Sequence, residues 1–190
     1  MGFEGAQGAS ATVRGWFHGR YRALRSTRAQ ELLTTLMPAL LQAIADTANP
    51  NASLGRFDRF LSNLPTGVQL FSMLMARPQL LELLAEIMGS APRLANYLAE
   101  NSSVVDAMTS AEFLAAPPAL TALRQEFAEE MRTALDLQDV LDLTRRRVKE
   151  HKFQIGVQVL GATIDADRSG AGYADLADAA LGSLLPAVSD

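Results

Sequence analysis

The sequence contains no cysteine, so it offers neither a disulfide framework nor a thiolate metal site, and it lacks a thiol nucleophile. Runs of β-branched residues, which a sheet needs, are missing, and only three tyrosines and one tryptophan accompany the eight phenylalanines. No apolar run approaches the roughly 18 residues of a membrane span. The N-terminus also lacks the basic and apolar segments of a signal peptide, so we expect a soluble, cytoplasmic protein that does not bind a membrane.

Positive charge is scarce as well. The formal net charge is −4 and the isoelectric point is about 5.2, so the whole molecule lacks the electrostatic character of a nucleic-acid-binding protein. Apolar residues, by contrast, make up 48% of the 190 positions. That content is sufficient for one domain, or for two small ones, with a sizeable buried core.

The longest helical pattern runs from Asp139 to Ile164. Its first half is amphipathic, because Val140, Thr144 and Val148 recur on one face at helical spacing. Its second half is apolar on opposite faces, which is typical of a helix surrounded by other helices. We therefore predict an all-α protein, a helical bundle of roughly eight to ten helices built around this long central helix, with Asp136 as its N-cap.

Other amphipathic segments fill most of the remaining chain. We predict a disordered start at 1–10, helices at 11–25 and 26–47, short helices that begin at Pro78 and Pro92, and a last helix at 173–188 after a polar loop at 165–172. Pro38 either kinks the second helix or starts a new one. The break at Ala115-Ala116-Pro117-Pro118 suggests two helical subdomains, 11–116 and 117–190.

Few residues are arranged for catalysis or metal binding. The segment that begins at Asp165 resembles the start of a calcium-binding loop, because Asp165, Asp167 and Ser169 would place oxygen ligands at alternate positions. The twelfth residue of such a loop should be a bidentate glutamate, but here it is Leu176. We therefore favour helix-capping residues in a flexible turn. His18 and His151 lack the partners of a triad or zinc site, and we expect both on polar faces. Glycine-rich phosphate loops are absent. We predict no catalytic, cofactor-binding or metal-binding residue.

Two basic clusters raise the alternative of nucleic-acid binding. In the first, the Arg14–Arg28 face, cations and rings share one helix, namely Arg14, His18, Arg22 and Arg25 with Trp16, Phe17 and Tyr21. The second is the run from Arg145 to Lys149. In an acidic protein such clusters are more often solvated faces or intramolecular ion-pair surfaces, so we expect no nucleic-acid partner.

Five segments, in order, resemble the bacterial family of bifunctional glutamine synthetase adenylyltransferase and adenylyl-removing enzymes, particularly its alphaproteobacterial members. They are RGWFHGRYRALRSTRAQELL (14–33), FDRFLSNLPTGVQLFSML (57–74), GSAPRLANYLAENSSVVDAM (89–108), HKFQIGVQVLGATI (151–164) and YADLADAAL (173–181). Enzymes of this family carry two nucleotidyltransferase domains separated by helical regions. The resemblance implies that this chain is the helical stretch between them, a linker after the adenylyl-removing domain that leads toward the adenylyltransferase domain.

The resemblance carries no catalytic residue onto this chain. The family's second catalytic motif is a Gly-Ser followed by D-x-D on strands, whereas Gly89-Ser90 runs into a helix and Gly182-Ser183 meets the end of the chain. ATP, magnesium, glutamine synthetase and the regulatory PII proteins are therefore implied for the parent enzyme. For this chain we expect no cofactor and no activity alone, with the neighbouring catalytic domains as its partners.

The leading hypothesis is thus a non-catalytic segment that spaces the two catalytic domains and offers docking surface. The alternative is an independent helical protein-interaction module. If the segment hypothesis holds, apolar surface should be exposed near Trp16, Phe17 or the last helix, where missing domains would dock.

Overall fold

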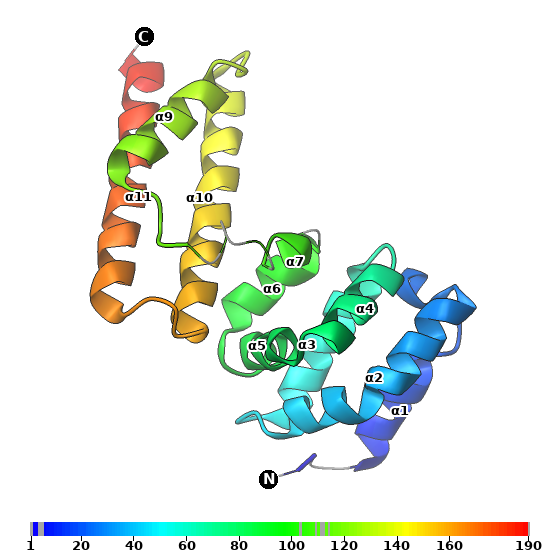
Figure 1. Ribbon diagram of the computed structural model, residues 1–190. Coiled ribbons are helices and arrows are strands. Elements are labelled where there is room, and N and C mark those ends of the chain that lie inside the picture. The colour runs from blue at the N-terminus through cyan, green and yellow to red at the C-terminus, as the bar shows by residue number, and fades with distance from the viewer. Residues whose placement is uncertain are drawn as a thin grey trace. The chain divides into compact units, whose positions relative to one another are not determined.

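The computed structural model describes residues 2–3, 6–102, 104–108, 110, 113 and 115–189. Across these residues the regular structure is helical and contains no strand, which confirms the all-α prediction. The chain divides into two compact units, Met1–Ser110 and Ala111–Asp190. Figure 1 shows the helices of both units.

The first unit is built from short helices that pack on one another. In order they are α1 (Ala6–Trp16), the 3-10 turn η1 (Arg22–Leu24), α2 (Thr27–Ala45), α3 (Pro50–Asn63), α4 (Val68–Ala76), α5 (Pro78–Ser90), α6 (Pro92–Glu100) and α7 (Val104–Ala107). The helix α3 lies against α5 and α6, while α2 lies against α4 and α5. Their apolar faces form a core with fully buried side chains such as Phe57, Phe60 and Phe71.

Local sequence signals set most of these helix ends. Ser26 accepts a hydrogen bond from the backbone N–H of Ala29 at the start of α2, as an N-cap residue does. Pro78 and Pro92 occupy the first turn of α5 and α6, as predicted. Pro38 lies inside α2, which continues as one helix to Ala45.

The first predicted helix is displaced along the chain. We expected a helix at 11–25 after a disordered start, but α1 begins at Ala6 and ends at Trp16. The backbone then turns at Gly19, whose positive φ of 77° suits glycine. Arg22 and Arg25 consequently lie beyond α1 and do not continue its face.

The second unit contains α9 (Leu120–Met131), α10 (Leu137–Leu160) and α11 (Ala166–Ser189). Its helices α10 and α11 lie side by side, and α9 packs on both (Figure 1). Asp136 accepts a hydrogen bond from the backbone N–H of Asp139 and caps α10, as predicted. The core between α9 and α11 consists of Leu123, Phe127, Leu176, Ala179 and Ala180.

The predicted long helix forms, but the structure does not show it as the centre of the whole chain. It has 24 residues, as many as α11, and its packing partners are α9 and α11. Phe153, Ile155 and Val157 are buried in its second half, as the apolar pattern predicts. The units divide at Ser110, ahead of the Ala115–Pro118 break, because the Gln158 amide of α10 donates hydrogen bonds to the carbonyls of Phe113 and Ala115.

The last helix begins earlier than the sequence indicates. We expected a polar loop at 165–172, yet α11 starts at Ala166 with Asp165 accepting a hydrogen bond from the backbone N–H of Arg168. Gly172 has a packing role inside α11, because a Cβ there would lie 3.2 Å from Pro117 and 3.3 Å from Ile155. The glycines that suggested a loop therefore belong to a helix.

Candidate functional site

The ring side chains of the Arg14–Arg28 face are used inside the first unit. Trp16 is fully buried, and its indole N–H donates to Asp58 Oδ1 over 2.7 Å. The Tyr21 hydroxyl donates to the same oxygen, also over 2.7 Å. Trp16 itself therefore exposes no apolar surface, whereas Phe17 beside it, with 36% of its surface exposed, agrees with the predicted exposure near this residue. Neither Trp16 nor Tyr21 is placed as a stacking surface for bases.

Asp58 also changes the acidity of Tyr21. Burial of the phenol, followed by its hydrogen bond to the Asp58 carboxylate, raises the pKa of Tyr21 from 10.0 to about 12. Both causes favour the neutral phenol over the charged phenolate. Tyr21 is consequently held as a hydrogen-bond donor that fixes the segment after α1 onto α3.

The two histidines have different environments. His18 is exposed, and its Nδ1 lies 2.6 Å from the carbonyl oxygen of Arg14, so it matches the predicted polar face. His151 is buried, with 9% of its surface exposed, and its Nε2 lies 3.1 Å from Glu126 Oε2. The expectation of a polar-face position is thus wrong for His151, because α9 covers it and supplies a carboxylate partner.

The second basic cluster forms the predicted intramolecular ion-pair surface. Arg147 Nε donates to Glu130 Oε2 over 2.7 Å, and its Nη1 lies 3.1 Å from Glu126 and 2.9 Å from Glu150. Arg146 also pairs with Glu130, and Arg145 pairs with Asp142. The pairs that Arg146 and Arg147 form with Glu126 and Glu130 join α9 to α10, and all three arginines are occupied by carboxylates of the same unit.

Glu130 is the central carboxylate of this surface. Burial alone would raise the pKa of its carboxyl, but the hydrogen bonds and charges of Arg147 and Arg146 outweigh that effect. The pKa of Glu130 therefore lies below its ordinary value. The side chain is only 10% exposed and stays ionised as the anchor of two arginines.

The residues of the calcium-like pattern do not come together as a metal site. Asp165 caps α11, Ser169 donates to the carbonyl of Ala166, and Leu176 belongs to the apolar core. Throughout the residues that the structure describes, no three His, Asp or Glu side chains form a group that could hold a metal ion. No helix within the described residues is both long enough and apolar enough to cross a membrane.

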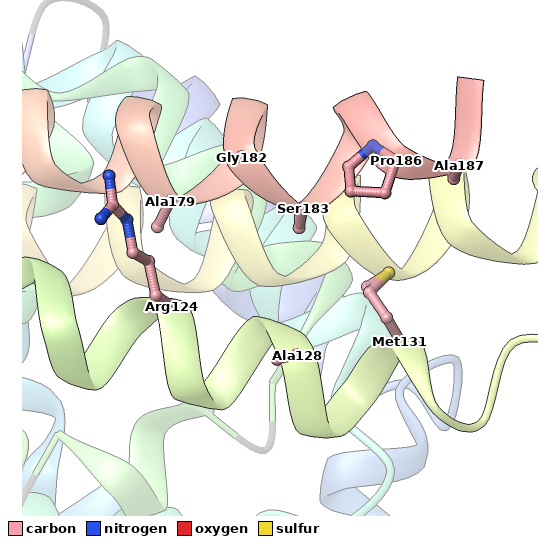
Figure 2. A pocket seen from close by; sticks show the side chains of 8 residues that line it. All are labelled: Arg124, Ala128, Met131, Ala179, Gly182, Ser183, Pro186 and Ala187. Atoms are coloured by element: carbon pink, nitrogen blue, oxygen red, sulfur yellow. The ribbon is translucent and has the colours of Figure 1, made fainter. Parts of the chain in front are cut away.

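A groove of about 670 Å³ lies between α9 and α11, and we call it the α9–α11 groove. Its lining consists of Arg124, Ala128 and Met131 from α9 with Ala179, Gly182, Ser183, Pro186 and Ala187 from α11. Figure 2 shows Arg124 and Met131 reaching toward α11, with the small Ala128 between them on α9. The small residues facing each other across the two helices leave this space open.

The helix α11 also carries exposed leucines outside the groove lining. Leu181 is 60% exposed and Leu185 is 65% exposed, one helical turn apart. They confirm the prediction that the last helix exposes apolar surface. The groove itself was not predicted, although the spacing of Ala179, Gly182, Ser183 and Pro186 marks one helical face of small residues.

The family model of glutamate-ammonia ligase adenylyltransferase matches residues 81–190. A "Bifunctional glutamine synthetase adenylyltransferase/adenylyl-removing enzyme" from Brucella suis is 41% identical over 188 residues, which cover 99% of this chain and 19% of the relative. The enzyme of that name from Mesorhizobium japonicum is 40% identical over 189 residues, covering 100% of this chain and 19% of the relative.

The corresponding enzyme from Caulobacter vibrioides is 38% identical, over 98% of this chain and 18% of its own length. The chain therefore spans about a fifth of the length of these curated relatives. No solved structure matches it.

Proposed function

Since the chain belongs to the glutamate-ammonia ligase adenylyltransferase family, we propose that it is a non-catalytic helical segment of an enzyme that adenylylates and deadenylylates glutamine synthetase. The observation that carries this proposal is the fraction of a long relative that the chain covers. The chain aligns over 99% of its length with a relative named as bifunctional, yet it accounts for 19% of that relative. We therefore place the two activities that the name describes mainly in the other four fifths of the enzyme's length.

Within such an enzyme, this segment spaces the two nucleotidyltransferase domains and offers docking surface to them. Its two units are each compact and helical, so they can separate the domains on either side of the segment. The α9–α11 groove, together with the exposed Leu181 and Leu185, supplies apolar surface of the kind found at protein interfaces. We propose this role as the reason for an apolar face on α11.

ATP and magnesium belong to the same proposal, but not to this segment. Glu126 and Glu130 are held by Arg147, and no three His, Asp or Glu side chains of the described residues form a group that could hold a metal ion. Magnesium is normally bound by carboxylates that keep some water ligands, together with nucleotide phosphates. The described residues do not fit that arrangement. We place the nucleotide and metal in the rest of the longer enzyme, with glutamine synthetase as its substrate and PII proteins as regulators.

An activity comparison tests the proposal directly. The 190-residue chain and the full-length product of the native gene are each assayed for AMP transfer to glutamine synthetase and for AMP removal. We expect both activities in the full-length enzyme and no turnover by the isolated chain above a blank without protein. Appreciable turnover by the chain alone would overturn its non-catalytic role. A native gene product that is itself 190 residues long would support the independent interaction module instead.

A further inference from the structure

We propose that the α9–α11 groove receives an amphipathic helix from another part of the longer enzyme, and that this helix carries a carboxylate opposite Arg124. The inference rests on the proposed function and identifies the surface and the chemistry by which the segment docks. It concerns only residues of the second unit.

The shape of the groove suits a helix. Arg124, Ala128 and Met131 recur along one face of α9, and Ala179, Gly182, Ser183, Pro186 and Ala187 recur along the facing side of α11. Because small side chains form the middle of the groove, a third helix can approach closely and place its own apolar ridge between α9 and α11. Met131, beside Pro186, gives one end an adaptable apolar wall (Figure 2).

The charge of the groove specifies one feature of the occupant. Arg124 is exposed and forms no ion pair with the residues that the structure describes, whereas Arg145, Arg146 and Arg147 of α10 are all paired. It is the charged residue of the lining, and its side chain extends from α9 toward α11 (Figure 2). A carboxylate on the docked helix would satisfy this guanidinium, which favours bidentate pairing with carboxylates.

Pro186 adds a polar contact point. Proline has no backbone N–H, so the carbonyl of Gly182, one turn earlier on α11, lacks its usual helical donor. Both residues line the groove. A side-chain donor on the docked helix, such as a serine hydroxyl or an amide, can therefore bond to this carbonyl and fix the register of docking.

Two features favour a helix of the longer enzyme over other occupants. The α11 residues that line the groove are all uncharged, so a second copy that docked through these same residues would not present one of their side chains as a carboxylate to Arg124. About four fifths of each long relative lies outside the matched region and can supply the helix.

Photo-cross-linking in the full-length enzyme tests the proposal. A benzophenone side chain is introduced at Ser183, inside the groove, or at Glu129, an exposed control position of α9 outside the groove lining. We expect cross-links from position 183 to one helical segment outside these 190 residues, at several times the yield from position 129. Mixing isotopically labelled and unlabelled enzyme separates links within one polypeptide from links between copies. Links mainly between copies, or no excess over the control, would overturn the proposal.

Charge reversal then tests the pairing. Arg124→Glu should lower the cross-link yield from position 183 about tenfold, corresponding to about 1.4 kcal/mol, and an Arg substitution at the acidic residue found in the linked segment should restore it. Arg132→Glu, just beyond α9 and outside the lining, is the matched control and should leave the yield unchanged. An equal loss with Arg132→Glu would refute the specific pairing. If the full-length enzyme has both activities but gives no cross-link, only the docking proposal is refuted. If the native gene product is itself 190 residues long, the proposed function is refuted.

Discussion

Asp58 fixes the beginning of the first unit by accepting hydrogen bonds from Trp16 and Tyr21. Asp58 lies 42 residues after Trp16 and 37 after Tyr21, and no local pattern links it to them. An aromatic residue beside arginines favours a stacking surface when it is considered alone, and that interpretation fails once a carboxylate from α3 lies 2.7 Å from the indole nitrogen. Pairings between distant elements are the part of a site that periodicity does not reveal.

Tyr21 gives a test of this anchor in alkaline solution. Its pKa is raised from 10.0 in the unfolded chain to about 12 in the folded protein, so folding favours the neutral phenol. The resulting stability is fully present below pH 10.0 and is lost as the pH rises toward about 12. Tyr21→Phe should lower the free energy of unfolding at neutral pH by about 1 kcal/mol, and should reduce this alkaline loss.

Urea unfolding across that pH range measures the stability effect. The phenolate absorbance of wild type minus that of Tyr21→Phe isolates the titration of this one tyrosine. A difference curve centred at pH 10.0 instead of near 12 would contradict the hydrogen bond to Asp58.

Glu130 and Glu129 form a matched pair for testing the ion-pair surface. Glu130 is nearly buried between Arg146 and Arg147, whereas exposed Glu129 accepts a hydrogen bond from Gln125. We expect Glu130→Gln to lower the free energy of unfolding by about 1–3 kcal/mol, because the arginines lose their shared carboxylate. Glu129→Gln should change it by less than about 0.5 kcal/mol. Urea denaturation at neutral pH measures both.

The direction of the Glu130 pKa shift also predicts how the free energy of unfolding changes in acid. The pKa of Glu130 is lowered by folding, so its contribution is present above the unfolded value of 4.5 and is lost as the pH falls through the folded value. Wild-type protein should therefore lose more stability below pH 4.5 than Glu130→Gln does. Parallel acid profiles for the two proteins would show that the carboxylate is not held by its arginines.

At the scale of the element, most helices follow from local rules, and the exceptions have identifiable causes. Proline at the first turn places α5 and α6, and Asp136 places the start of α10. The start of α11 was missed because Gly170 and Gly172 favour a turn when sequence is considered alone. Packing of Gly172 against Pro117 and Ile155 supplies the reason for a glycine in that helix, and that reason is tertiary.

The two glycines of α11 should therefore respond differently to alanine. A Cβ at Gly170 would meet nothing within 4 Å, so Gly170→Ala should raise the free energy of unfolding by about 1 kcal/mol through helix propensity. A Cβ at Gly172 would lie 3.2 Å from the Pro117 side chain, so Gly172→Ala should lack this gain or be destabilising. Chemical denaturation compares the two variants. Equal stabilisation by both would mean that α11 does not pack closely on Pro117.

At the scale of the whole chain, the all-α class and the apolar last helix could be predicted because both depend on composition and helical periodicity. The α9–α11 groove could not, since it depends on which helices become neighbours and on Ala128 facing Gly182 and Ser183. The family resemblance provides the functional context but does not identify the surface. Under the proposed function, another part of the longer enzyme covers the apolar side chains that remain exposed on α11.

Exposed apolar surface on α11 should also make the isolated 190-residue chain self-associate at high concentration. Leu181 and Leu185 lie one turn apart on α11 and form an exposed apolar pair, whereas Leu135 is 92% exposed but lies in the turn between α9 and α10. Burying a leucine side chain contributes about 1.5–3 kcal/mol, so the double variant Leu181→Ser/Leu185→Ser should weaken association tenfold or more. The control Leu135→Ser should leave it unchanged. Sedimentation equilibrium across a concentration series measures the dissociation constants. Equal weakening by the Leu135→Ser control would show that general hydrophobicity, and not Leu181 and Leu185 on α11, drives association.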